Sequence, residues 1–185
     1  DRRSKPAQRQ VVALPLGRTS PALIDLENPE KAVRFGGVSR PLRPALAPDK
    51  SWMASGSLHG SGTILWDTAT GKQRRKLDSG NAYCFASPDG LLLAVAGSDA
   101  YRIFDTRSWE VVQSIPSERG SELPNFAAFS SDGSLLAIVK EHSRVQLWDP
   151  RRWRLLADLI SPDPQIIQWL AFSPDARRLA VATTR

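Results

Sequence analysis

Short apolar runs of four to seven residues recur along the chain, separated by clusters of Gly, Pro, Ser and Asp. This pattern is typical of antiparallel β-strands joined by tight turns. The separators Pro-Asp-Gly at 88–90 and Ser-Asp-Gly at 131–133 are turn sequences, because Pro presets φ, Asp bonds back to the backbone and Gly accepts a positive φ. No segment keeps an apolar period of 3.6 residues, so the sequence predicts strands and no long helix.

The apolar runs belong to an internal repeat. Its first landmark is a turn aspartate that recurs at intervals of 40, 43 and 43 residues, at Asp49, Asp89, Asp132 and Asp175. Four residues after each aspartate comes an apolar residue followed by alanine. Six residues before each aspartate the chain has, in order, Arg43, Tyr83, Phe126 and Trp169. A register this regular predicts a repeat architecture.

A second landmark recurs in step with the first. An aromatic residue followed by aspartate ends three short runs of β character, as Trp66-Asp67, Phe104-Asp105 and Trp148-Asp149. A weaker copy stands earlier, at Ile24-Asp25. Each unit therefore supplies about four short strands. Such a sheet cannot bury both of its faces alone, and stacking successive sheets face to face would solve this, which is the arrangement of a propeller.

The units resemble WD40 repeats, with Phe-Ser-Pro-Asp, Leu-Ala-Val and Val-x-Leu-Trp-Asp in that order. The resemblance implies an all-β fold, a partial WD40-type propeller of four to five four-stranded antiparallel blades within a larger ring. Residues 1–9 are expected to be a linker and residues 10–185 the propeller. Within it the expected parts are the end of one blade at 10–36, three complete blades at 44–78, 81–115 and 125–160, and the start of another at 166–185.

The repeats depart from the family pattern at two places. The Gly-His dipeptide that typically precedes the inner strand is missing, and the turn aspartate before the third strand is replaced by His59 and His142, while Asp99 lies one residue out of register. We therefore expect blade stability to rest on apolar packing rather than on the family's buried hydrogen-bond network. The aromatic residues expected to supply that packing are Trp66, Phe104 and Trp148, and Trp169 is likewise predicted to be core.

Composition excludes several classes of protein. The 185 residues carry 25 Lys+Arg against 19 Asp+Glu, a formal net charge of +6, and 41% are hydrophobic, too many for a disordered tail. No apolar run approaches the length of a membrane span, and we expect a cytoplasmic protein with no membrane segment. Because the first residue is Asp, we expect the chain to be an excerpt of a longer protein.

The sequence offers no catalytic constellation. The two histidines, His59 and His142, fall in turns two blades apart, and the single cysteine, Cys84, is flanked by aromatic residues that favour a packed, inert thiol. No phosphate-binding loop, nucleophile elbow or kinase motif is present. We therefore expect no enzyme activity within this chain, no cofactor and no metal.

The predicted function is a scaffold that binds a protein or peptide partner through loops on one face of the propeller. The loop residues predicted to contribute are Arg40, His59, Asp99, Glu118, Arg119, Glu141 and His142. An alternative is a binder of nucleic acid or another anionic polymer through arginine side chains, which is less favoured because the arginines are scattered over successive units. The late repeats also resemble bacterial WD40 proteins whose propeller follows a serine/threonine kinase domain. A second alternative is therefore an accessory or regulatory part of a signalling kinase whose catalytic domain lies upstream.

Overall fold

The computed structural model describes residues 10–13, 20–38, 40–58, 62–117, 125–141, 143–160 and 165–184. Their strands form five antiparallel sheets, and the strands of each sheet follow one another in chain order. The prediction of an all-β fold is confirmed, and in the described ranges the one helix is the short η1 (Pro29–Lys31).

The first sheet contains β1 (Gln10–Ala13), β2 (Ala22–Asp25) and β3 (Val33–Arg34). The second contains β4 (Ala45–Leu46), β5 (Trp52–Ser55), β6 (Thr63–Asp67) and β7 (Gln73–Leu77). The third contains β8 (Ala82–Ala86), β9 (Leu92–Gly97), β10 (Ala100–Asp105) and β11 (Val111–Pro116). The fourth contains β12 (Ala127–Phe129), β13 (Leu136–Glu141), β14 (Arg144–Asp149) and β15 (Arg154–Ile160). The fifth contains β16 (Ile167–Phe172) and β17 (Leu179–Thr183).

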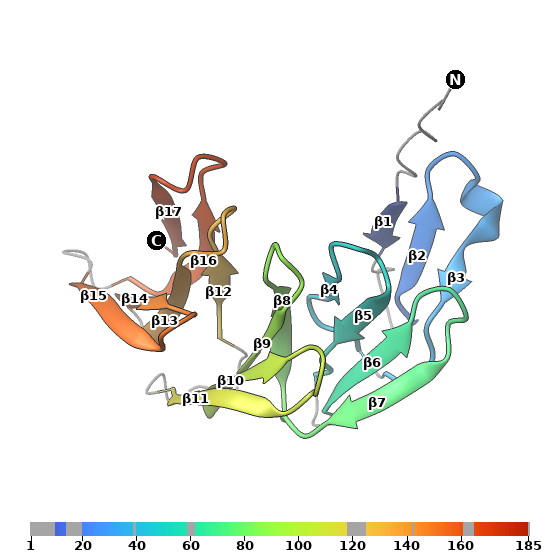
Figure 1. The fold of residues 1–185 in the computed structure, drawn as a ribbon, viewed down its shortest axis with the longest axis horizontal. Helices are drawn as coiled ribbons and strands as arrows, with labels where there is room; N and C mark the ends of the chain where they lie inside the picture. The colour runs from blue at the N-terminus through green and yellow to red at the C-terminus, as the bar shows by residue number, and fades with distance from the viewer. Residues whose placement is uncertain are drawn as a thin grey trace.

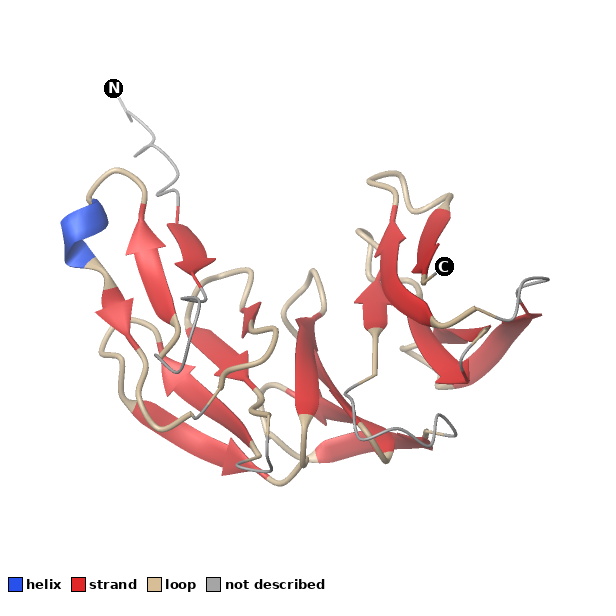
Figure 2. Ribbon diagram, turned by 180° about the vertical axis from the view of Figure 1, so that it is seen from behind, coloured by secondary structure: helices blue, strands red, loops and turns tan. Residues whose placement is uncertain are grey.

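The five sheets follow one another along an arc (Figure 1). The first strands of the last four sheets, β4, β8, β12 and β16, lie on the concave side, and the fourth strands, β7, β11 and β15, lie on the convex side. Neighbouring inner strands contact one another from β4 to β8, from β8 to β12 and from β12 to β16. The view from behind shows the same succession, with the first and the last sheet on opposite arms of the arc (Figure 2).

The core consists of four apolar layers, one between each pair of neighbouring sheets. A middle sheet is therefore covered on both faces. Strand β9 shows the consequence, because its sequence Leu-Leu-Ala-Val-Ala-Gly has no alternation of apolar and polar residues and Leu93, Ala94, Val95 and Ala96 are all fully buried. Face-to-face stacking thus explains the continuous apolar runs in the sequence.

The aromatic residues at equivalent repeat positions differ in burial. Trp66 is 1% exposed, donates its indole N–H to the carbonyl of Gly36 at 3.0 Å and packs against Phe35 with ring centroids 5.7 Å apart. Phe104 is also buried, whereas Trp148 is only partly buried.

The prediction that Trp169 is a core residue is wrong, since its side chain is 46% exposed. Strand β16 carries an irregularity in its pairing between Ile167 and Trp169, and its buried residues are Ile167 and Leu170. Trp169 lines the space enclosed by the inner strands, and its ring also lies near Phe126, just before β12 of the neighbouring sheet.

Candidate interaction surface

The order of strands divides each four-stranded sheet into two ends. In an antiparallel sheet the connection from the second to the third strand and the connection from the fourth strand to the next sheet lie at one end, which we call the loop end. The connections from the first to the second strand and from the third to the fourth lie at the other, which we call the turn end. Such connections are where a rigid scaffold carries recognition residues.

Three of the predicted interaction residues lie at the loop end and within the described residues. Arg40 precedes β4, Asp99 lies between β9 and β10, and Glu141 ends β13. The other four, His59, Glu118, Arg119 and His142, lie outside the described residues.

Asp99 and Glu141 are each paired with an arginine three residues further along. An oxygen of the Asp99 carboxylate lies 2.6 Å from a guanidinium nitrogen of Arg102, and this hydrogen bond lowers the pKa of Asp99. Glu141 lies 3.3 Å from Arg144, which also bonds Asp158 at 2.6 Å. These ion pairs are confined to single sheets, so they hold the loop side chains in place and do not join them into one site.

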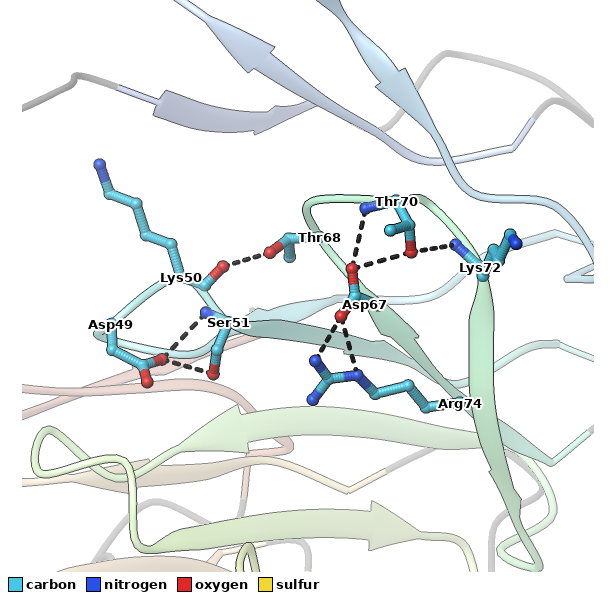
Figure 3. A network of polar contacts seen from close by, with 8 residues as sticks. All are labelled: Asp49, Lys50, Ser51, Asp67, Thr68, Thr70, Lys72 and Arg74. Carbon is cyan, nitrogen blue, oxygen red and sulfur yellow. Dashed lines mark hydrogen bonds and ion pairs between the residues drawn. The ribbon is translucent and has the colours of Figure 1, made fainter.

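The turn end is fixed by hydrogen bonds from turn residues to the repeated aspartates (Figure 3). Asp49 accepts bonds from the backbone N–H and the hydroxyl of Ser51, at 2.9 and 2.8 Å. Asp67 accepts bonds from the N–H and hydroxyl of Thr70, both at 2.8 Å, and is ion-paired with Arg74. Together these contacts, the Arg74 bond foremost, lower the pKa of Asp67 to about 2. The same turn bonding recurs at Asp89, Asp105, Asp132, Asp149 and Asp175.

The inner strands enclose an open groove of about 500 Å³. Its walls come from β4, β8, β12 and β16 and consist mainly of alanine, aromatic and other apolar side chains. Arg43, just before β4, is the one charged residue among the described residues that line the groove. The side chains of the groove are therefore mostly apolar with a single positive charge, and its exposed surface also includes polar atoms.

The guanidinium of Arg43 lies against two aromatic rings. Its carbon is 4.2 Å from the ring centroid of Trp169 and 4.7 Å from that of Phe85, which are distances of cation–π contact. The backbone of the arginine is held by its carbonyl, which accepts the N–H of Cys84 at 3.1 Å. Burial lowers the pKa of the guanidinium, and nearby Tyr83 opposes this in part.

A row of aromatic rings extends to the ring of Trp169 that contacts Arg43. Tyr83 and Phe126 have ring centroids 5.1 Å apart, and Phe126 and Trp169 have centroids 6.1 Å apart. These residues and Arg43 are the four equivalents found six residues before the turn aspartates. Because each stands near the beginning of an inner strand, the cluster lies toward the loop end of the groove.

No family model matches the chain. The chain is 33% identical over 112 residues to small ribosomal subunit protein RACK1y of Oryza sativa subsp. japonica, a match that covers 56% of this chain and 33% of that protein. It is 40% identical over 77 residues to small ribosomal subunit protein RACK1z of the same organism, covering 40% of this chain and 22% of that protein. The chain thus matches no more than about a third of the length of these curated relatives.

These similarities agree with the repeated four-stranded sheets, their inner strands on the concave side and the aromatic-Asp landmark at the end of each third strand. The chain folds as part of a WD40-type β-propeller. In propeller terms the sheets are blades, and the groove is the part of the central channel that these blades enclose.

The described part of the propeller contains no group of three or more side chains of the kinds that bind metal ions. Cys84 is buried, and burial raises the pKa of its thiol to about 12, so the thiolate that acts as a nucleophile is scarce at neutral pH. The structure has no helix, over the residues it describes, with the length and apolar character needed to cross a membrane.

Arg43 and Trp169 were not among the residues predicted for the interaction surface. The sequence marks Arg43 as the one non-aromatic residue in an otherwise aromatic repeat position, and this substitution was the available signal. That signal does not show that Arg43 and Trp169 meet, because they belong to the second and fifth sheets and come together only through the curvature of the propeller.

Proposed function

We propose that this chain is a non-catalytic WD40 scaffold that binds a protein or peptide partner at the loop end of its blades. The observation that carries the proposal is the open groove at the centre of the inner strands, which is lined in part by Trp169, a residue that is 46% exposed. Exposed aromatic side chains beside an apolar hollow are typical anchors of protein interfaces. The turn end, by contrast, has its aspartates committed to hydrogen bonds within the blades.

Rigidity supports the same proposal. Binding to a surface that is already ordered costs less conformational entropy. Here four apolar layers and the hydrogen-bonded turns hold the blades in a fixed arrangement. We propose the cytoplasm as the compartment. We also propose a regulatory role for this propeller within a larger signalling protein, such as a bacterial serine/threonine kinase to which it is fused.

The test uses a photo-crosslinking amino acid placed at Asp99, at the loop end, or at Arg107, at the turn end of the same blade. The full chain is incubated with an extract of its source cells and irradiated. We expect a protein adduct from position 99 that is absent or much weaker from position 107. Equal adducts from the two ends would refute a loop-end site, and an adduct destroyed by nuclease would favour the anionic-polymer alternative.

A second candidate partner follows from the names of the two relatives, both of which are small ribosomal subunit proteins. We propose the small ribosomal subunit as a candidate assembly for this chain as well. The chain would then co-sediment with purified small subunits on a sucrose gradient at moderate salt. Failure to co-sediment would exclude this partner and leave the scaffold proposal intact.

A further inference from the structure

Among the described residues that line the groove, none carries a negative charge to match that of Arg43. The ion pairs between two described residues involve Arg74, Arg102, Arg144 and Arg152, and no described carboxylate pairs with Arg43. The two serines of the groove wall have bonded hydroxyls, since Ser130 donates to Asp132 and Ser131 donates to the carbonyl of Pro174, each at 2.6 Å.

The surroundings of Arg43 compensate its positive charge only in part. The rings of Trp169 and Phe85 attract a cation through their faces, but they are poor acceptors for the in-plane N–H groups of a guanidinium. A half-buried charge surrounded by apolar walls gains most from an anion that accepts those N–H groups in a bidentate pair. The groove is therefore electrostatically complementary to a single negative group.

We propose that Arg43 binds the carboxylate of an aspartate or glutamate in a partner peptide that lies along the groove between the inner strands. The inference rests on the proposed scaffold function and names the chemistry of its partner. Apolar side chains next to the acidic residue would contact the exposed ring of Trp169 and the alanine-rich walls. A volume of about 500 Å³ lies within the range of pockets that bind small ligands and short segments.

The lining favours a peptide carboxylate over a phosphate polymer. A nucleic acid presents a row of charges, and proteins that bind one tightly bring several lysines or arginines to it. The described wall of the groove contributes one cation, and its other residues are apolar or already hydrogen-bonded. One charge beside apolar surface matches an isolated acidic residue in an otherwise apolar segment.

The experiment selects ligands from a displayed library of random heptapeptides on the full 185-residue chain. The most enriched peptide is then synthesised in three forms, as selected, with its Asp or Glu replaced by Asn or Gln, and with a phosphoserine in that place. Fluorescence anisotropy measures their affinities for the wild-type chain, for R43Q and for R107Q, a control that removes an exposed arginine at the turn end.

We expect the selected clones to share an acidic residue between apolar residues. Replacing that residue by its amide, or Arg43 by Gln, should weaken binding by about 10- to 100-fold, the loss typical of a charged hydrogen-bonded pair, and R107Q should leave binding unchanged. The amide peptide tests the pair on the wild-type chain even if R43Q folds poorly.

Four results would overturn the proposal. Selected peptides without an acidic residue, or equal binding by R43Q and the wild-type chain, would show that Arg43 does not choose the partner, while peptide binding itself would stand. Tighter binding of the phosphoserine form than of the carboxylate form would assign the groove to phosphate. If no heptapeptide were enriched at all, the proposed peptide-binding function would fail together with this inference.

Discussion

Truncation of Trp66 and of Trp148 to alanine removes the same atoms from the same repeat position in two different blades. Trp66 is fully buried, packs against Phe35 and bonds the carbonyl of Gly36. Trp148 is partly exposed, and its indole N–H donates to the side chain of Gln146 at 3.3 Å. The pair therefore measures what burial at this position contributes to the stability of the blades.

Trp66→Ala should lower the free energy of unfolding by about 4 kcal/mol, within the range for deletion of a fully buried aromatic side chain. Trp148→Ala should cost about 2 kcal/mol, because water already covers part of its ring and less apolar area is lost. Trp66→Phe should cost only about 1–2 kcal/mol. Phe104 shows that a phenylalanine fits the equivalent site in the next blade, so the loss would come mainly from the bond to Gly36.

The assay is equilibrium unfolding in urea, followed by far-ultraviolet circular dichroism on the three variants and the parent chain. A shift of the midpoint at constant slope reports stability, while a changed slope would indicate that blades unfold separately. Because the two alanine variants have nearly the same effect on the unfolded chain, their difference reflects the folded state. Equal losses for Trp66→Ala and Trp148→Ala would refute the role assigned to burial.

Three further experiments test other parts of the structure. Cys84, with a pKa raised to about 12 by burial, should resist a thiol reagent at pH 8 until urea unfolds the chain, and rapid labelling of the folded protein would contradict its burial. The pKa of Asp132 is lowered to about 2, chiefly by the hydrogen bond from the hydroxyl of Ser130. The ionised carboxylate therefore stabilises the fold above the pKa of an unfolded aspartate, about 4, and this stabilisation disappears as the pH falls toward 2. The melting temperature of Asp132→Asn should therefore fall less steeply than that of the parent between pH 5 and 2, and parallel curves would contradict the assignment. In the same urea titration, Gly56→Ala should lower the free energy of unfolding by about 3 kcal/mol or more, because a Cβ there would stand 2.0 Å from the carbonyl oxygen of Ala82. Gly80→Ala should lower it by about 1 kcal/mol, because Gly80 has open space around it but a φ of +58°.

The repeated strands were predictable because their determinants are local. Short apolar runs, turn aspartates and an aromatic-Asp landmark all lie within about forty residues and recur in successive units. The four-stranded sheets and their inter-sheet apolar layers follow from that pattern, since a sheet with two apolar faces must be covered on both. Fold class is consequently the best determined property of this sequence.

The groove was not predictable because its parts are distant in the chain. Trp169 occupies an apolar repeat position, and only the three-dimensional arrangement of the blades places it in the channel beside Arg43. Arg43 is 126 positions earlier and meets it across the inner strands. No local rule relates two such residues. The predicted loop residues Asp99 and Glu141 were identifiable from their place in the repeat, but their arginine partners depend on side-chain geometry.

The turn between the third and fourth strands shows how packing overrides a local rule. Four residues after the landmark aspartate, the second sheet has Gly71 with a φ of +68°, whereas the third and fourth have Trp109 and Trp153 with φ values of +59° and +52°. A left-handed backbone costs a side chain about 1–2 kcal/mol, and glycine avoids that cost.

Trp109 offsets the backbone strain by packing against the preceding blade. Its ring meets Trp52 edge-on, with centroids 5.3 Å apart, and its carbonyl accepts a bond from Arg75 at 3.3 Å. A Cβ at Gly71 would likewise point at the preceding sheet, 3.0 Å from the side chain of Val33. The same backbone geometry therefore directs this position toward the neighbouring blade in both turns, and a large side chain there strengthens the contact between blades. Trp109 thus acts as an anchor between blades, whereas Trp169 is the exposed aromatic residue beside the groove.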